Sequence, residues 1–474
     1  MNFGDNAISR WISPPHSQVP EQPSPSFVDR FDRLKTTYWN RGYGIVMLGI
    51  IGVSITSVQS FMYYKFIDFV GEQNKIDFSH YGCVSYNMDG YYIGLIPGGV
   101  LATVYPAHNI LGIFVAISSI GHLLIIMSIH YLNAFTHCIL QFCVGTTLAV
   151  VDVSIDRVWT YWVPLNKQSI RHVPIVFYVL IYDGGFLYDN IDKLHDAHSS
   201  YTLTLFTGVI GLAWYVLWLY VINGNYSFRG MNLDFILFGG SNNSRYSFGT
   251  SGVSLTRSII SDIPWKSICT SKPLLVIVLL CFCDARLTES YDSDVYGEDL
   301  FEWNLRTYTI ILLLLFVVLV ELVPEIIEPI STSTVRKFWS CSYFGSAGII
   351  FILEAVFGHT ARTNKISKYF LKEMDYLYNF GFNINVLDIA PKYASLIDSL
   401  LLSIHYISKF LWVYVNRILS YRILNEVETA VLMAIICFAV AVLYAIFASG
   451  EQQPWAEELV EENQQNMMEN DNKS

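Results

Sequence analysis

Long apolar runs alternate with short polar stretches over most of the chain. A helix needs about 20 apolar residues to cross the hydrocarbon core of a bilayer, and most of these runs reach or approach that length. They cover residues 44–70, 91–105 (short and Gly-rich), 110–129, 134–155, 174–187 (weak) and 203–222, and then, beyond a polar stretch at 223–271, residues 273–283, 308–323, 338–357, 366–390 (poor), 395–419 and 430–448. Six spans, a polar loop and six further spans predict an all-α membrane protein of about 12 transmembrane helices, arranged as two six-helix halves around a central cavity.

The composition supports a membrane protein and offers no enzyme signature. Hydrophobic residues make up 53% of the 474 residues and charged residues only 15%, and the mean hydropathy is +0.39. Soluble domains carry about 25% charged residues. The chain has no P-loop, no GxSxG and no HExxH motif. We therefore predict that the protein is not an enzyme and holds no cofactor or metal.

The charges and cysteines limit the possible partners. The formal net charge of -11 comes partly from an acidic tail after residue 450. An acidic tail argues against nucleic acid as a partner and against docking on anionic lipid headgroups. The 8 cysteines have no metal-ligand spacing, and they imply no disulfide framework.

The chain divides into five segments. Residues 1–28 are polar and Pro-rich, which indicates a disordered tail and not a signal peptide. We expect a disordered cytosolic tail at 1–40, an N-terminal six-helix half at 41–224, a cytosolic central loop at 225–271, a C-terminal six-helix half at 272–449 and an acidic cytosolic tail at 450–474.

Basic residues predict that both termini face the cytosol. Under the positive-inside rule, clusters of Lys and Arg mark cytosolic loops. Such clusters precede the first span, occupy the central loop and follow the eighth span. A further cluster, Arg362, Lys365, Lys368 and Lys372, violates the rule and makes the tenth span the least certain one.

Five short motifs link the chain to a known family. They are IPGGVLA at 96–102, IPWKS at 263–267, STSTVRK at 331–337, GFNINVLDIAPKYAS at 381–395 and YAIFASGEQQPWAE at 444–457. With these motifs in family order, the chain resembles the vesicular glutamate transporters, organic-anion transporters of the major facilitator superfamily, over roughly residues 40–457. The motif residues to which we assign a structural role are Pro97, Gly98, Gly99, Trp265, Arg336, Lys337, Asp388, Pro391 and Tyr393.

The resemblance implies a fold and a function. It implies twelve helices that work by alternating access around a site near the midplane of the membrane. It further implies potential-driven uptake of an organic anion such as glutamate into synaptic or other intracellular vesicles, with the plasma membrane as an alternative location. Protons, chloride, sodium or phosphate are the inorganic partners that the resemblance suggests, and lipid surrounds the spans.

The chain departs from the family at the positions expected to bind substrate. The family carries an Arg on its first, fourth and seventh helices, and these positions are Gln59, Gln141 and Asp284 here. Glutamine can still donate hydrogen bonds to a carboxylate, but it brings no charge, and an aspartate repels an anion. Two alternatives to anion transport follow: a scaffold or regulator that no longer transports, or a transporter for a neutral or cationic solute with Asp284 as its counter-charge.

Ionisable residues within the spans are candidates for ion coupling. Glu321 and Glu354 lie in strongly apolar spans, where each is either a protonatable site or a paired structural residue. Asp398, His405 and Lys409 share one helix face at i, i+7 and i+11. This stripe either faces a cavity and relays protons, or faces the protein interior.

Overall fold

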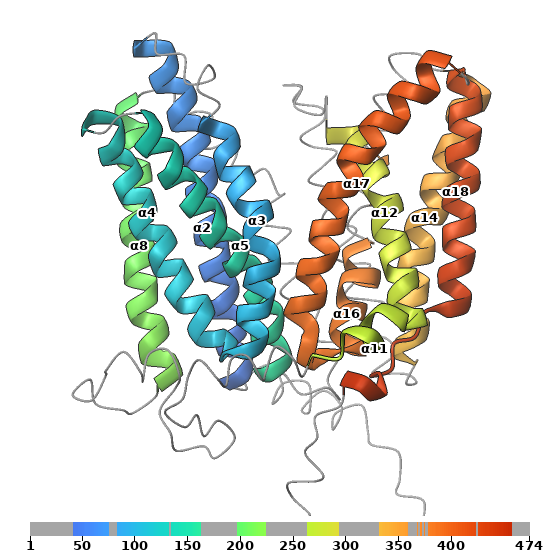
Figure 1. The fold of residues 1–474 in the computed structure, drawn as a ribbon, viewed down its shortest axis with the longest axis horizontal. Coiled ribbons are helices and arrows are strands. Elements are labelled where there is room, and N and C mark those ends of the chain that lie inside the picture. The colour runs from blue at the N-terminus through green and yellow to red at the C-terminus, as the bar shows by residue number, and fades with distance from the viewer. Residues whose placement is uncertain are drawn as a thin grey trace, which may run out of the picture.

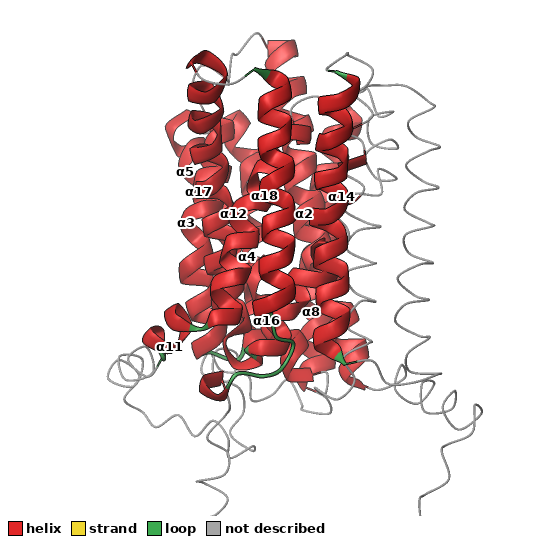
Figure 2. Cartoon of the chain, turned by 90° about the vertical axis from the view of Figure 1, so that its right-hand side faces the viewer, coloured by secondary structure: helices red, strands yellow, loops and turns green. Residues whose placement is uncertain are grey.

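The computed structural model describes residues 41–74, 83–131, 134–162, 197–223, 263–292, 331–358, 367, 370, 371, 374, 378–422 and 425–456. These residues form helices joined by turns, and none of them lies in a strand. The all-α class predicted from the sequence is therefore confirmed. The long helices run side by side along one direction (Figure 2).

The helices form two groups, shown on the left and right of Figure 1. Each group has its own hydrophobic core. The first group consists of α2 (Arg41–Asn74), α3 (Cys83–Val104), α4 (Ala107–Tyr131), α5 (Ala134–Trp162) and α8 (Ala197–Asn223). The second consists of α11 (Trp265–Thr270), α12 (Lys272–Asp292), α14 (Thr332–Phe357), the π turn η4 (Asn379–Asn383), α16 (Ile384–Ile389), the 3-10 turn η5 (Pro391–Tyr393), α17 (Ala394–Arg422), α18 (Glu426–Phe447) and the 3-10 turn η6 (Pro454–Ala456).

Nine of the predicted spans correspond to long helices of the structure. The predicted runs at 174–187 and 308–323 lie outside the described residues, as do Glu321 and residues 366, 368, 369, 372, 373 and 375–377 of the predicted run at 366–390. The observed helices extend beyond the apolar runs, because polar residues complete their ends. Ser331 caps α14 by accepting from the Thr334 amide, and Asn425 forms a reciprocal capping box with Glu428 at the start of α18.

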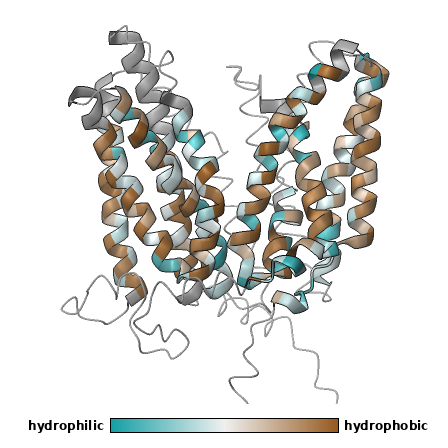
Figure 3. Ribbon diagram, in the orientation of Figure 1, coloured by the Kyte–Doolittle hydropathy of each residue, from teal (hydrophilic) through white to brown (hydrophobic). Residues whose placement is uncertain are grey.

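The outward faces of the helices are apolar. Six helical segments of the described residues are long and apolar enough to cross a membrane: Ala107–Ile125, Phe135–Trp162, Thr202–Ile222, Thr332–Phe357, Pro391–Val415 and Val427–Phe447. Large side chains such as Phe206 on α8 and Ile435 on α18 are each 60% exposed. In Figure 3 the hydrophobic colour covers the long outer helices, while hydrophilic residues gather at the end of the molecule near α16. An exposed apolar surface of this extent fits lipid contact.

Small residues let α3 and α5 pack closely within the first group. A Cβ atom at Gly145 of α5 would lie 1.8 Å from the carbonyl oxygen of Asn87. A Cβ atom at Gly90 of α3 would lie 2.1 Å from that of Phe142. Neither position accepts a side chain without movement of the backbone, so glycine sets the distance between the two helices.

One expectation about the cysteines was wrong. Cys138, near the start of α5, is disulfide-bonded, whereas the sequence gave no reason to expect a disulfide. The spacing of cysteines along a chain does not reveal which of them a helical bundle brings together.

The two groups touch near one end of the molecule, the end that carries the α3–α4 turn (Figure 1). There α3 and α5 pack against η5 and the first half of α17. We call this end the α3–α4 end.

Candidate functional site

Gln59, at the position of the family's first-helix Arg, is fully enclosed by its own half. Its side chain on α2 is 0% exposed. Its Nε2 donates to Ser119 Oγ at 3.0 Å and to the carbonyl oxygen of Thr207 at 3.0 Å, while Ser118 Oγ donates to its Oε1 at 3.4 Å. These contacts tie α2 to α4 and α8. Gln59 therefore acts as a structural link between three helices and leaves no hydrogen-bonding group directed at a solute.

Gln141, which the sequence predicts at the position of the fourth-helix Arg, is buried, and one of its hydrogen-bond donors is unsatisfied among the described residues. It is 0% exposed on α5, and its Oε1 accepts from Asn87 Nδ2 of α3 at 3.3 Å. Its Nε2 has no hydrogen-bond partner among the described residues. A buried donor without a partner costs about 1–3 kcal/mol.

Asp284, at the position of the seventh-helix Arg, is the centre of a buried polar cluster. It lies on α12 and is 1% exposed. Tyr343 of α14 donates from its hydroxyl to Asp284 Oδ1 at 2.7 Å, and His405 Nδ1 of α17 lies 3.4 Å from Oδ2. On the other side of the ring, His405 Nε2 lies 3.5 Å from Thr288 Oγ1. The cluster joins three helices of the second half.

The three family positions therefore have separate surroundings. Gln59 contacts α4 and α8, Gln141 contacts α3, and Asp284 contacts α14 and α17. The hydrogen bonds of each side chain are made with neighbours in its own half.

The contacts between the halves combine close packing with a few polar bonds. A Cβ atom at Gly99 of α3 would lie 2.2 Å from Ser399 Oγ and 2.7 Å from the Ser395 carbonyl oxygen, both on α17. The rings of Tyr92 on α3 and Tyr406 on α17 are 4.4 Å apart between centroids. The absence of a side chain at Gly99 is thus what allows the helices of the two halves to meet.

Polar groups at the ends of the helices add to this contact. Arg157 Nη1 and Thr160 Oγ1 of α5 donate to the carbonyl oxygen of Pro391, at 2.8 and 3.0 Å. The carboxyl groups of Asp156 on α5 and Asp398 on α17 lie close to each other across this contact. Asp398, which the sequence placed on a polar helix face, therefore lies at the junction between the halves.

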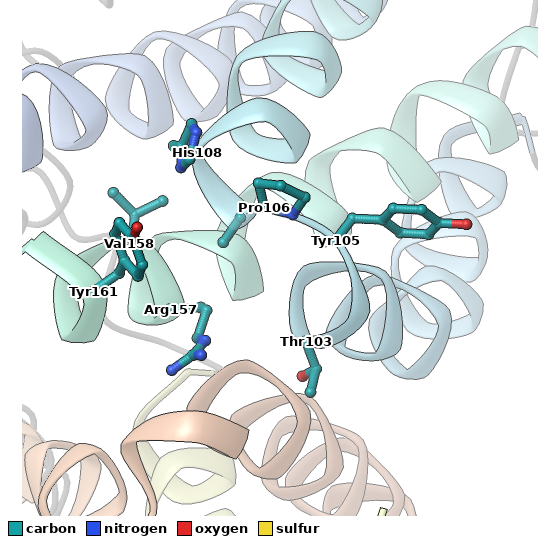
Figure 4. Close-up of a pocket in the computed structure, with 8 residues that line it drawn as sticks. Thr103, Tyr105, Pro106, His108, Arg157, Val158 and Tyr161 are labelled. Carbon is teal, nitrogen blue, oxygen red and sulfur yellow. The ribbon is translucent and has the colours of Figure 1, made fainter. Parts of the chain in front are cut away.

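A small pocket lies beside this junction, at the turn between α3 and α4 (Figure 4). The Arg157 guanidinium forms part of the pocket lining. Its lining residues are Thr103, Tyr105, Pro106, Ala107, His108, Arg157, Val158 and Tyr161. The pocket therefore belongs to the α3–α4 end.

Three of the five sequence motifs assemble at the same end of the second half. Arg336 Nε of STSTVRK donates to Asp388 Oδ2 of GFNINVLDIAPKYAS at 2.7 Å, and both side chains are buried. The segment around Gly450 joins them, because the Gly450 amide donates to Ser333 Oγ and the Gln453 amide donates to the Ile389 carbonyl oxygen. The motifs are therefore a structural assembly that fixes the start of α17.

Pro391 marks the break within that assembly. The backbone leaves the helical region at Ala390, with φ -148° and ψ 65°, and α17 starts after η5. The Pro391 carbonyl oxygen accepts from both Arg157 and Thr160. Tyr393 is 6% exposed and its ring packs near Trp455 at 6.1 Å. This break places backbone acceptors directly against the first half.

The remaining predicted residues lie outside these clusters. Trp265 starts α11 and is 40% exposed, Lys337 is half-buried on α14, and Pro97 is exposed on α3 next to the buried Gly98. Glu354 is 7% exposed and lies in the last turn of α14, away from its middle. The sequence did not single out Tyr343, Thr288 or Asn87, because their partners come from distant parts of the chain.

Comparison with known proteins agrees with this architecture. No family model matches the chain. A probable vesicular glutamate transporter of Caenorhabditis elegans, eat-4, is 25% identical over 389 residues, which cover 79% of this chain and 66% of that protein. Vesicular glutamate transporter 2 of Homo sapiens is 26% identical over 392 residues, covering 78% and 64%. The chain thus spans just under two thirds of the length of the curated relatives it matches.

Solved structures show the same fold. A major facilitator superfamily transporter, FucP, in the outward conformation aligns with a TM-score of 0.54 at 14% identity, over 86% of this chain and 100% of that one. The proton:xylose symporter XylE aligns with a TM-score of 0.54 at 12% identity, over 87% and 97%. The chain therefore shares its fold with these major facilitator superfamily transporters, and its sequence is similar to those of vesicular glutamate transporters.

Proposed function

We propose that the chain is a secondary transporter that works by alternating access. The contact between the halves at the α3–α4 end carries this proposal. It consists of glycine-to-serine packing, apolar and aromatic contacts of Tyr406 with α3, and two hydrogen bonds to the Pro391 carbonyl oxygen. Such contacts hold two rigid bundles together at one end and break without unfolding either bundle, as hinge or rocking motions require.

We infer that the α3–α4 end faces the cytosol. The disulfide at Cys138 lies near the start of α5, at the opposite end of that helix from Arg157 and Thr160. Disulfides persist in oxidising compartments and are rare in the cytosol. The positive-inside pattern of the sequence leads to the same orientation. In this orientation the two halves are in contact on the cytosolic side, and the membrane of an intracellular vesicle is the proposed location.

We further propose that the solute carries no net negative charge. An anion that leaves water needs fixed cations, and the three family positions hold two glutamines and an aspartate. Arg336, which is fully buried, is already paired with Asp388. A small neutral or cationic organic solute avoids the repulsion that Asp284 would impose on a carboxylate.

The test is uptake by the purified full chain in liposomes with an imposed membrane potential and pH gradient. The panel comprises radiolabelled glutamate, inorganic phosphate, and neutral and cationic amino acids and amines. We expect uptake of a neutral or cationic compound above that of protein-free liposomes, and none of glutamate. Glutamate uptake would overturn the substrate proposal, and no uptake of any compound by folded protein would favour a scaffold or regulator.

A further inference from the structure

A histidine and an aspartate form a buried pair in the second half that the family comparison does not explain. Asp284 is 1% exposed and Tyr343 is 0% exposed, while the side chain of His405 is 15% exposed. They come from α12, α14 and α17. The cluster therefore combines a carboxylate removed from solvent with an imidazole that keeps some access to it.

The carboxylate needs more than the tyrosine to remain charged in this place. An ionised carboxylate buried without compensation costs several kcal/mol. Tyr343 supplies one hydrogen bond to Oδ1, at 2.7 Å. His405 Nδ1 faces Oδ2 at 3.4 Å, which exceeds the length of about 2.8 Å for a charge-assisted bond. A small movement of the ring would shorten this contact when the imidazole gains a proton.

Thr288 lets the histidine exist in both protonation states. Its hydroxyl oxygen is 3.2 Å from the Ala285 carbonyl oxygen and 3.5 Å from His405 Nε2. When the hydroxyl donates to Nε2, the imidazole is neutral and its Nδ1–H faces Asp284. When the hydroxyl donates to Ala285, its oxygen can accept from Nε2–H, and the ring is an imidazolium. Rotation of the Thr288 hydroxyl therefore provides His405 Nε2 with a hydrogen-bond partner in either protonation state of the imidazole.

Other titratable groups lie near the pair on α12 and α17. Cys281 and Cys283 of α12 lie near Asp284, and Cys281 also lies near Tyr378 and Asp398. Lys409 follows His405 by one turn of α17, and Arg286 lies two residues beyond Asp284 on α12, where residues face different sides. His405 is the cationic partner that faces Asp284 Oδ2.

His405 also stands next to the contact between the halves. Tyr406, the following residue, packs its ring against Tyr91 at 6.0 Å and Tyr92 at 4.4 Å, both on α3. The rings of His405 and Tyr406 are 5.7 Å apart. His405 is therefore one residue away from the aromatic contact between α17 and the first half.

We propose that Asp284 and His405 bind one exchangeable proton as a unit, and that binding of this proton is coupled to the position of α17 against α3. Proton binding changes the charge of the pair from -1 to zero without an added counter-ion. The coupling rests on the proposed alternating-access function, whereas the proton site itself does not. This coupling would make transport by the chain proton-linked. It also assigns a role to Asp284, which the sequence predicts at the position of a family arginine.

The proton site is tested without any solute. The purified full chain in detergent is subjected to pH jumps in weakly buffered solution, and proton uptake is followed with a pH-sensitive dye. We expect Asp284→Asn and His405→Gln each to take up fewer protons than the parent chain over the pH range in which the parent pair titrates, and the double variant to lose less than the sum of the two single losses, because the two groups titrate as a coupled pair. His122→Gln, which changes a buried histidine of the first half, serves as the matched control for loss of an unrelated imidazole.

The coupling is tested by distances across the α3–α4 end. Spin labels at positions 161 and 451, both exposed in the structure, report on the two halves after replacement of the exposed Cys143 and Cys269. We expect the distance distribution to shift with pH in the parent chain and to be independent of pH in Asp284→Asn and His405→Gln. Tyr343→Phe keeps both titrating groups and should retain the shift at a different pH, which separates titration from loss of folding.

The outcomes distinguish the two proposals. Unchanged proton uptake in both single variants, or additive loss in the double variant, would overturn the shared proton site. A lost proton with an unchanged distance shift would overturn the coupling. Failure of transport in liposomes with an intact shared proton would contradict the proposed function and leave the proton site standing.

Discussion

Asp388 and Asp284 are both buried aspartates of the second half, yet their partners give them different roles. Asp388 forms a 2.7 Å ion pair with Arg336, whose charge is permanent. Asp284 has a tyrosine and a histidine, whose charge depends on pH. At the scale of residues, the partner decides whether a buried carboxylate forms a permanent ion pair or responds to pH.

Removing the permanent partner should destabilise the protein. In Arg336→Met, Asp388 would remain buried without its cation, and the expected loss is about 3–5 kcal/mol of folding free energy. Thermal unfolding of the purified chain in detergent measures it. Lys337→Met, at the neighbouring half-buried position, should have little effect. The double variant Arg336→Met/Asp388→Leu should recover much of the loss, and an unstable double variant would contradict the ion-pair explanation.

Restoring a family arginine should not restore anion transport. In Gln59→Arg the guanidinium would enter a site already filled by Ser119 and the Thr207 carbonyl, with Gly211 against the Gln59 Nε2. We expect a loss of several kcal/mol of stability from an unpaired buried charge. Gln59→Leu, which loses the hydrogen bonds but adds no charge, should be less damaging. Glutamate uptake by stable Gln59→Arg protein would show that this reasoning is wrong.

At the scale of elements, glycines decide which helices touch. The α3–α5 pair is held at backbone distance by Gly90 and Gly145, and α2 accommodates the ring of Trp214 at Gly52. Trp214 in turn stacks on Trp218 with centroids 5.1 Å apart. Large and small residues thus alternate across these contacts, which is how helices pack where lipid provides no hydrophobic driving force.

A single methyl group should separate α3 from α5. In Gly145→Ala the new Cβ would lie 1.8 Å from the Asn87 carbonyl oxygen, which backbone movement alone can relieve. We expect a destabilisation of about 1–3 kcal/mol from this overpacking, measured by thermal unfolding. Gly44→Ala on α2 is the matched control, because nothing lies within 4 Å of its Cβ position. Equal stability of the two variants would contradict the close approach.

At the scale of the whole molecule, the two halves are separate bundles that meet at the α3–α4 end through close packing of α3 and α5 against α17 and through a few polar bonds. Two donors from α5 share the Pro391 carbonyl oxygen. The break in the chain at Pro391 and the assembly around Arg336 keep this acceptor in place. The contacts that must break for the two halves to separate thus lie at one end of the molecule.

Blocking that contact should change the conformation without unfolding the halves. In Gly99→Leu the side chain would overlap Ser399 and the Ser395 carbonyl, so the α3–α4 end should stay apart. Spin labels at positions 161 and 451 should show a longer distance, and liposome uptake should fall strongly. Gly345→Leu on α14, where nothing lies within 4 Å, is the control expected to change neither quantity. An unchanged distance between the labels in Gly99→Leu would contradict the proposal that the halves separate at the α3–α4 end.

The sequence by itself determined the class of protein. Apolar length fixes membrane helices, because the thickness of the bilayer fixes the number of residues needed. The break at Pro391 could also be predicted, because proline cannot donate a helical hydrogen bond, and the motifs at 331–337 and 381–395 indicated a resemblance to the vesicular glutamate transporters. The sequence also predicted that Gln59, Gln141 and Asp284 stand where that family carries arginines.

Only the tertiary structure decided what the replacements do. Gln59 and Gln141 appeared to be equivalent, yet one is fully hydrogen-bonded and the other retains a spare donor. Asp284 appeared to be a counter-charge for a solute, yet it faces His405, which is 121 residues further along the chain. Hydrogen bonds depend on distances of a few tenths of an ångström between groups from different helices. Hydrophobic periodicity carries no such information, because it specifies which face is buried and not which side chain it meets.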